Sequence, residues 1–123
     1  IGGHSLGGTM AAQFLASHPD DAGRVSGLVL WGARLSAGIS VASLPIKVVS
    51  IYGTSDGIAP KGLTDAARRA GLPASATIVA ISGGNHSMFG DYGLQKGDNA
   101  LAVPLDVARA QIVSATMTAF QQP

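Results

Sequence analysis

The chain opens with IGGHSLGGTM, in which a serine stands between two glycines as Gly3-His4-Ser5-Leu6-Gly7. This G-x-S-x-G pattern is typical of a sharp strand-to-helix turn that presents a serine hydroxyl for nucleophilic attack. Both glycines are expected because neighbouring backbone comes too close for a Cβ. A glycine-rich turn can also cradle a phosphate, but a P-loop would end in Lys-Ser or Lys-Thr. The turn continues as Gly8-Thr9-Met10 without a lysine, which favours the nucleophilic serine.

A serine hydroxyl is a poor nucleophile unless a base takes its proton and a carboxylate orients that base. Asp56 in YGTSDGIAP and His86 in SGGNHSMF each come just after an apolar run. The carboxyl ends of parallel strands meet at one edge of a sheet, so we expect both side chains beside Ser5. The chain order Ser5, Asp56, His86 therefore predicts a nucleophile, an orienting acid and a general base.

Each of these three residues also has an ordinary structural interpretation. Ser5 can be a turn serine, Asp56 a turn former ahead of Gly57, and His86 a surface loop residue. Their joint placement after apolar runs favours the chemical interpretation. Three further carboxylates stand outside the expected chain order and are predicted to be turn or cap residues: Asp91, Asp98 and Asp106.

The remaining histidines and aromatic residues carry weaker signals. His4 occupies the variable position of the motif and is expected to pack or hydrogen bond, and His18 is expected at the end of a helix beside Pro19. Three aromatic residues can equally line a substrate pocket or pack in the core: Trp31, Phe89 and Tyr92. The histidines are accompanied by no cysteine and no carboxylate cluster, so we predict no metal site and no cofactor.

The segments that must position these residues alternate between two patterns. Continuous apolar runs predict buried strands at 25–31, 46–52 and 76–81, and helical spacing predicts helices at 6–18, within 60–70 and at 104–121. Continuous apolar strands separated by helices indicate a parallel sheet with helices on both faces. The predicted fold class is therefore α/β, and such sheets bind ligands at the carboxyl ends of their strands.

The composition narrows the function classes. The chain has 123 residues, of which 46% are hydrophobic and 12% charged, as in globular domains. Its net charge of +1, without a basic run, does not support nucleic-acid binding. No cysteine framework, signal peptide or apolar stretch of about 18 residues is present in the sequence.

Three stretches of the chain resemble the α/β-hydrolase superfamily: GGHSLGGTMAA, VVSIYGTSDGIAP and GGNHSMFGDYG. The last is similar to a bacterial branch near the dienelactone-hydrolase-like proteins, although dienelactone hydrolases proper commonly have cysteine where Ser5 stands. The resemblance implies that Ser5, Asp56 and His86 are the nucleophile, acid and base. It also implies that the backbone N–H of Leu6 forms half of the oxyanion hole.

The resemblance covers the C-terminal half of the hydrolase fold. Ile1 directly precedes the glycine-rich turn, so we expect residues 1–123 to be one partial domain that lacks the N-terminal strands and the oxyanion loop. We expect the missing half to be its partner, and the strand at 25–31 to be left as an unpaired edge. The resemblance further implies a bacterial protein whose missing half can carry an N-terminal membrane anchor.

The expected function is that of a serine hydrolase acting on a small-molecule carboxylic ester, lactone or thioester through an acyl-enzyme. Two alternatives stay open. One is a perhydrolase activity on the same fold; a dehalogenase would instead require aspartate at position 5. The other is a ligand-binding or scaffold protein that keeps the fold without turnover. The sequence does not identify the acyl group or the alcohol.

Overall fold

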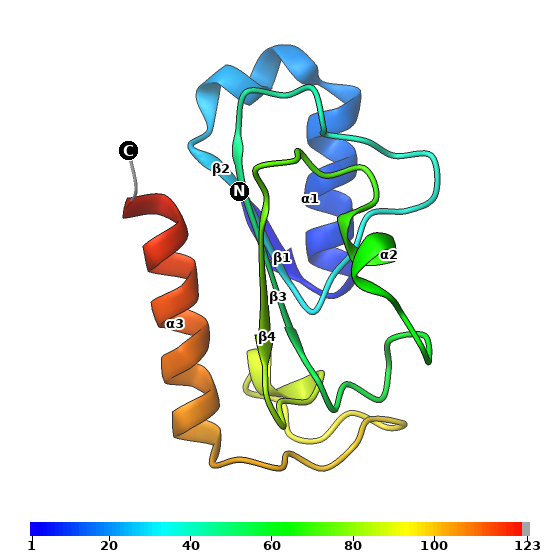
Figure 1. Ribbon diagram of the computed structural model, residues 1–123, viewed down its shortest axis with the longest axis vertical. Coiled ribbons are helices and arrows are strands. Elements are labelled where there is room, and N and C mark those ends of the chain that lie inside the picture. The colour runs from blue at the N-terminus through cyan, green and yellow to red at the C-terminus, as the bar shows by residue number, and fades with distance from the viewer. Residues whose placement is uncertain (122–123) are drawn as a thin grey trace.

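The computed structural model describes residues 1–121, which contain a four-stranded parallel sheet in the order β1-β2-β3-β4 (Figure 1). The strands are β1 (Gly2–His4), β2 (Gly27–Trp31), β3 (Lys47–Gly53) and β4 (Thr77–Ile81). In the register, His4 pairs with Trp31 and Trp31 with Ile51, two residues before β3 ends. Because all four strands run in one direction, the loops that follow them leave the sheet at the same edge.

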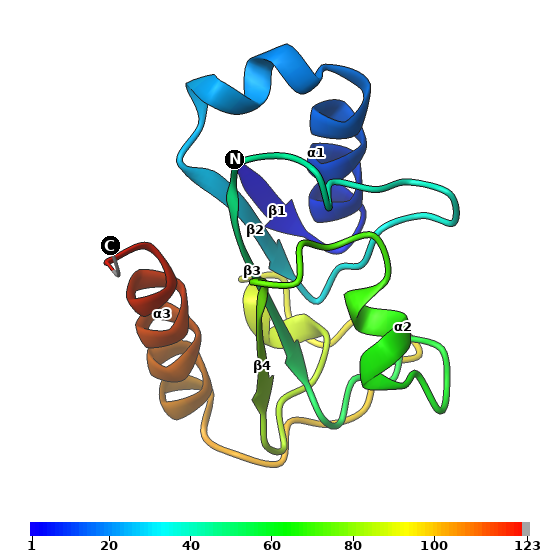
Figure 2. The same ribbon diagram turned by 45° about the horizontal axis from the view of Figure 1, so that its top comes forward.

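Helices cover both faces of this sheet, as the sequence predicts. Helix α1 (Leu6–Ser17) and the short helix α2 (Asp65–Arg69) lie on one side, and α3 (Leu105–Gln121) lies on the other (Figures 1 and 2). Two 3₁₀ helices, η1 (Pro19–Arg24) and η2 (Ser87–Phe89), complete the regular structure of residues 1–121. The fold class predicted from the sequence, α/β with a parallel sheet, is confirmed.

The core consists of one hydrophobic cluster on each face of the sheet. Alternate strand residues point to opposite faces, so Val48 faces α1 while its neighbour Val49 faces α3. Each fully buried Leu or Ile side chain contributes about 1.5–3 kcal/mol of transfer free energy. The α1 cluster includes Ala11, Ala12, Leu15, Leu28 and Leu30, and the α3 cluster includes Ile51, Ile81, Met88, Ala108 and Ile112.

The sequence-based boundaries of the elements are accurate for the strands and less accurate for the middle helix. The three predicted strands differ from the observed ones by two residues at most. The helix expected within 60–70 is reduced to α2, where the Thr64 side chain accepts a hydrogen bond from the Ala67 N–H at 3.2 Å. Gly62 and Gly71 adopt positive φ on either side of α2, which breaks the helical path.

The strand before Ser5 corrects one expectation from the sequence. Residues 2–4 form β1, and Gly2 pairs with Val29 of β2. The Ile1 carbonyl also accepts a hydrogen bond from the Val29 N–H at 2.9 Å. The outer strand on this side of the described sheet is therefore β1 rather than β2, and β1 attaches the start of the Ser5 turn to the sheet.

Candidate active site

Ser5 occupies a strained turn between β1 and α1. Its φ of 54° and ψ of −126° make it the one non-glycine residue with positive φ among residues 1–121. Its N–H donates to the Trp31 carbonyl at 2.9 Å, and its carbonyl accepts from the N–H groups of Gly8 and Thr9. A residue persists in such a conformation only where its surroundings fix it, so these bonds hold the turn that presents the Ser5 side chain.

Gly3 and Gly8 allow this turn to pack closely, whereas the glycines that flank the serine in the motif are Gly3 and Gly7. A Cβ on Gly3 would lie 2.6 Å from the Gly7 carbonyl carbon, as expected from the sequence. A Cβ on Gly7, in contrast, would meet nothing within 4 Å apart from its chain neighbours and the backbone of its own helix, so the expectation for this glycine is wrong. The second close approach belongs to Gly8, whose Cβ would lie 2.6 Å from the Gly3 carbonyl oxygen.

The two helical glycines therefore make a matched pair of substitutions for stability. We expect Gly8→Ala to lower the free energy of unfolding by about 1–3 kcal/mol, because the new methyl group overlaps backbone that cannot move freely. We expect Gly7→Ala to leave it unchanged or raise it by up to about 1 kcal/mol, because alanine favours the helix. Chemical unfolding of both variants measures the difference, and equal stabilities would contradict the packing argument.

His86 connects Ser5 to Asp56 through two hydrogen bonds. The Ser5 hydroxyl lies 3.0 Å from His86 Nε2, and His86 Nδ1 lies 2.8 Å from Asp56 Oδ2. The side chains of His86 and Asp56 are only 3% and 5% exposed. With the proton on Nδ1 donated to the carboxylate, Nε2 is left as an acceptor for the Ser5 hydroxyl. The three residues brought together are those predicted from the chain order.

Asp56 is held as a carboxylate by the loop that carries it. Burial by itself would raise the pKa of Asp56, but hydrogen bonds from His86 and from the Ala59 and Ile58 N–H groups outweigh it and lower the pKa. The N–H groups of Ile58 and Ala59 lie 2.8 and 2.9 Å from Asp56 Oδ1, and His86 occupies Oδ2. Asp56 is therefore ionised at neutral pH and can fix the orientation of the imidazole.

The loop that carries Asp56 and the loop that carries His86 follow neighbouring strands, β3 and β4, and are joined near the sheet. The Thr54 N–H donates to the Ile81 carbonyl at 3.0 Å, and the Ser55 N–H donates to the Gly84 carbonyl at 2.8 Å. The segment after β4, yellow in Figure 1, lies at the end of the sheet where these strands finish. The carboxyl-edge placement expected from the sequence is thus observed.

The match to known proteins agrees with this arrangement. Residues 1–109 match the model of the alpha/beta hydrolase family. The chain belongs to this family. Searches of curated proteins and of solved structures each return no significant match. The closer resemblance to the dienelactone-hydrolase-like branch stays a prediction, whereas a hydrolase-type activity in the general sense is supported by the family.

His4 packs against His86 in this hydrolase. The two ring centroids lie 4.7 Å apart, and the His4 ring also contacts Phe89 and Tyr92 at 5.3 and 6.0 Å. Burial lowers the pKa of His4, and the nearby His86 lowers it further. His4 is therefore neutral at neutral pH and acts as a packing partner of His86, and its buried Nε2 has no hydrogen-bond partner within residues 1–121.

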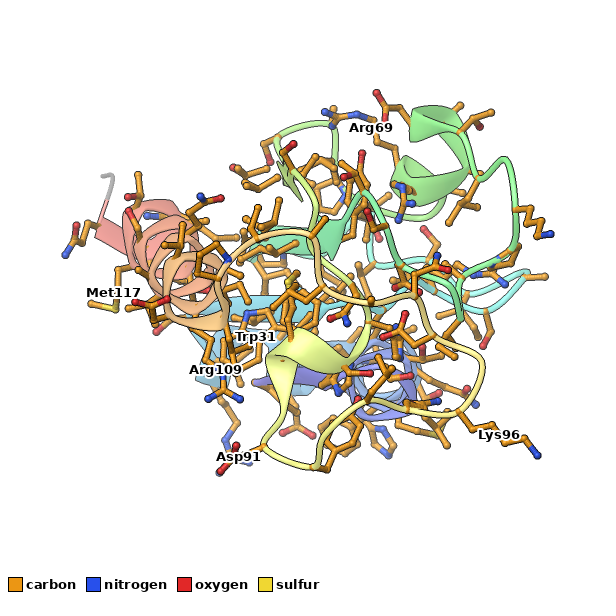
Figure 3. All side chains as sticks on the ribbon, turned by 90° about the horizontal axis from the view of Figure 1, so that it is seen from below. Trp31, Arg69, Asp91, Lys96, Arg109 and Met117 are labelled. Atoms are coloured by element: carbon orange, nitrogen blue, oxygen red, sulfur yellow. The ribbon has the colours of Figure 1, made fainter. Side chains whose placement is uncertain are left out.

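The three aromatic residues proposed for the substrate pocket lie elsewhere. A cavity of about 270 Å³ opens beside Ser5 and His86 on the α1 face, and its lining includes none of the three. Trp31 donates from Nε1 to Thr116 Oγ1 at 3.1 Å and packs beside α3 (Figure 3). Phe89 joins the same cluster, and Tyr92 is 51% exposed. Trp31 and Phe89 are thus partly buried against the α3 cluster and do not line the cavity beside Ser5.

Leu6 begins α1 and lines the cavity, with its side chain 69% exposed. The first N–H groups of a helix have no partner within the helix, so the Leu6 N–H is free of helical bonding at this end. An oxyanion role for it stays a prediction. Sequence reasoning missed two arginines that line the same cavity, Arg34 and Arg68, of which Arg68 stacks over the Tyr52 ring at 3.4 Å.

None of the described helices is long and apolar enough to cross a membrane. Within residues 1–121, no group of three or more His, Asp or Glu side chains is arranged to hold a metal ion.

Proposed function

We propose that the chain is a serine hydrolase that cleaves a carboxylic ester, a lactone or a thioester through an acyl-enzyme. The observation that carries the proposal is the continuous line of hydrogen bonds from Ser5 Oγ through His86 to Asp56. All three residues line a cavity large enough for a small ester. The order and geometry match the requirements of nucleophilic catalysis by serine.

The proposed reaction has two halves. In the first, Ser5 Oγ bonds to the ester carbonyl carbon while His86 Nε2 takes the hydroxyl proton, and the Leu6 N–H donates to the developing oxyanion. The C–O bond to the alcohol then breaks, and His86 gives its proton to the leaving oxygen. In the second half, water attacks the acyl-enzyme by the same route, which frees the acid and restores Ser5. Asp56 remains ionised throughout and stabilises the imidazolium.

A covalent probe tests the proposal. We expect a fluorophosphonate to label the full-length protein on the peptide that contains Ser5, because only an activated serine reacts quickly with it. Prior incubation with p-nitrophenyl acetate should slow the labelling, and the protein should release p-nitrophenol catalytically. Heat-unfolded protein serves as the control for nonspecific labelling.

Each alternative gives a different result in this experiment. Absence of labelling together with absence of ester hydrolysis would overturn the proposal and favour a non-catalytic ligand-binding or scaffold protein. Labelling of Ser5 with turnover only when hydrogen peroxide is supplied would favour a perhydrolase.

A further inference from the structure

One segment contacts both loops of the candidate active site. It consists of Gly97, Asp98 and Asn99, and we refer to it as the 97–99 segment. Asp98 Oδ1 accepts the Gly57 N–H at 2.9 Å, and Asp98 Oδ2 accepts the Ser87 N–H and the Ser87 hydroxyl at 2.8 and 2.7 Å. Gly57 directly follows Asp56, and Ser87 directly follows His86. A single carboxylate therefore joins the residue after the acid to the residue after the histidine.

Asn99 bonds to the residues that directly precede Asp56 and His86. Its side-chain Nδ2 donates to the Ser55 carbonyl at 2.9 Å, and its own carbonyl accepts from Asn85 Nδ2 at 2.9 Å. Ser55 directly precedes Asp56, and Asn85 directly precedes His86. The 97–99 segment thus bonds to both neighbours of Asp56 and to both neighbours of His86.

The backbone of the 97–99 segment packs tightly against the loop that carries Asp56. A Cβ on Gly57 would lie 2.7 Å from the Asn99 N and 2.9 Å from the Gly97 carbonyl oxygen. Backbone therefore lies directly on backbone at this point. A displacement of the 97–99 segment must be transmitted to Gly57, and hence to Asp56.

We propose that Asp98 is a positioning residue of this hydrolase, which sets the relative placement of Asp56 and His86. The proposal rests on the proposed function, since it concerns the same site. The loops are also joined near the sheet through Thr54 and Ser55, but these bonds lie before Asp56 and before His86. Asp98 joins the residues that follow Asp56 and His86. Without it, the two loops would be joined only before these residues, and the 2.8 Å contact between His86 and Asp56 would be held from one side only.

The chemistry of the contacts requires an ionised carboxylate. Four donors converge on the two Asp98 oxygens, namely the N–H groups of Gly57, Asn99 and Ser87 and the Ser87 hydroxyl, and a carboxylate accepts without donating. Burial would raise the pKa of Asp98, but the hydrogen bonds from the Ser87 hydroxyl and from the Gly57 and Ser87 N–H groups outweigh it and lower the pKa. An asparagine would turn an NH₂ group towards one of these donors and break the link on that side.

Asp98→Asn tests the proposal, with Asp91→Asn as the matched control. Asp91 comes from the same loop region, its side chain is 99% exposed, and its contact is with Arg109 at 3.5 Å (Figure 3). In the full-length protein we expect Asp98→Asn to lower kcat for p-nitrophenyl acetate by about 10–100-fold, the loss that a small misplacement of reacting groups causes. We expect KM to change less than twofold, and Asp91→Asn to match the wild type in both constants.

A nuclear magnetic resonance measurement separates positioning from a loss of stability. The proton between His86 Nδ1 and Asp56 should give a far-downfield resonance in the wild type. In Asp98→Asn, studied well below its unfolding temperature, we expect this resonance to move upfield or to broaden through exchange. Global destabilisation alone would lower the unfolding temperature and leave the resonance of the folded protein in place.

The possible outcomes are distinct. An unchanged resonance or an unchanged kcat in Asp98→Asn would overturn the proposal. If the wild type hydrolyses no ester, the proposed function fails, while the resonance still tests whether Asp98 sets the contact between His86 and Asp56. If Asp98→Asn does not fold, Ser87→Ala takes its place. It removes the 2.7 Å bond from the Ser87 hydroxyl to Asp98, together with the 2.9 Å bond that this hydroxyl accepts from the Gln95 N–H, and it keeps the Ser87 N–H bond to Asp98. For Ser87→Ala we expect a smaller fall in kcat and a resonance shift in the same direction. An unchanged kcat or an unchanged resonance in this variant would overturn the proposal.

Discussion

Replacing Ser5 with alanine is expected to lower kcat for ester hydrolysis by about 10⁶-fold, the loss seen when the nucleophile of a serine hydrolase is removed. Without the hydroxyl, His86 has no proton to accept and no acyl-enzyme can form. Binding and oxyanion donation remain, and they support a residual rate about 10³–10⁴-fold above that of water. Steady-state release of p-nitrophenol, corrected for spontaneous hydrolysis, measures the loss.

Alanine is the appropriate replacement at this strained position. It keeps a Cβ at the φ of 54°, so the backbone strain of the turn is the same in both proteins. Glycine would relax the turn and confuse the loss of the hydroxyl with a change of shape. Ser36→Ala is a suitable control, because Ser36 is exposed and its side chain makes no hydrogen bond to residues 1–121. Turnover above about 1% of wild type in Ser5→Ala would place the nucleophile elsewhere.

The residues of the hydrogen-bonded line could be predicted because their positions follow from the topology. Ser5, Asp56 and His86 each stand just after an apolar run, and in a parallel sheet all such positions reach one edge. No knowledge of side-chain packing is needed for that step. The strand boundaries were predicted for the same reason, since continuous apolar runs mark strands that are buried on both faces.

The same continuous apolar pattern explains why the sequence did not show which face of the sheet Trp31 lies on. In a strand that alternates polar and apolar residues, the pattern itself reveals the solvent face, but β2 is apolar on both faces. Trp31 shares a face with Val29 and packs towards α3, while Leu30 packs towards α1. From this segment the cavity beside Ser5 is lined by Gly32, Ala33 and Arg34, which follow β2, and not by Trp31.

Asp98 could not be recognised because its partners are tertiary. It lies twelve residues beyond His86 in a glycine-rich loop, where an aspartate usually forms a turn or a cap. It bonds instead to Gly57, which is 41 residues away in the sequence. The tight approach at Gly57 is likewise invisible in the sequence, where a glycine after Asp56 suggests only a turn.

Replacing Asp56 with asparagine is expected to lower kcat by about 10⁴-fold, the loss that the corresponding change causes in serine hydrolases. Asparagine keeps an oxygen that can accept the N–H groups of Ile58 and Ala59, so the loop should keep its shape. Its amide group, however, donates to His86 Nδ1 and moves the imidazole proton to Nε2. The Ser5 hydroxyl then faces a donor and cannot pass on its proton.

The decisive comparison for this carboxylate is with Asp91 and Asp98. Asp56 contacts His86 directly, Asp98 acts on it through Gly57 and Ser87, and Asp91 contacts Arg109. The three asparagine variants should therefore rank in kcat as Asp91, then Asp98, then Asp56, with steps of about 10–100-fold and then about 100–1,000-fold. Far-ultraviolet circular dichroism checks that all three are folded at the assay temperature. A mild loss in Asp56→Asn beside a severe one in Asp91→Asn would identify a different acid, because only the carboxylate bonded to Nδ1 can select the imidazole tautomer that accepts the Ser5 proton.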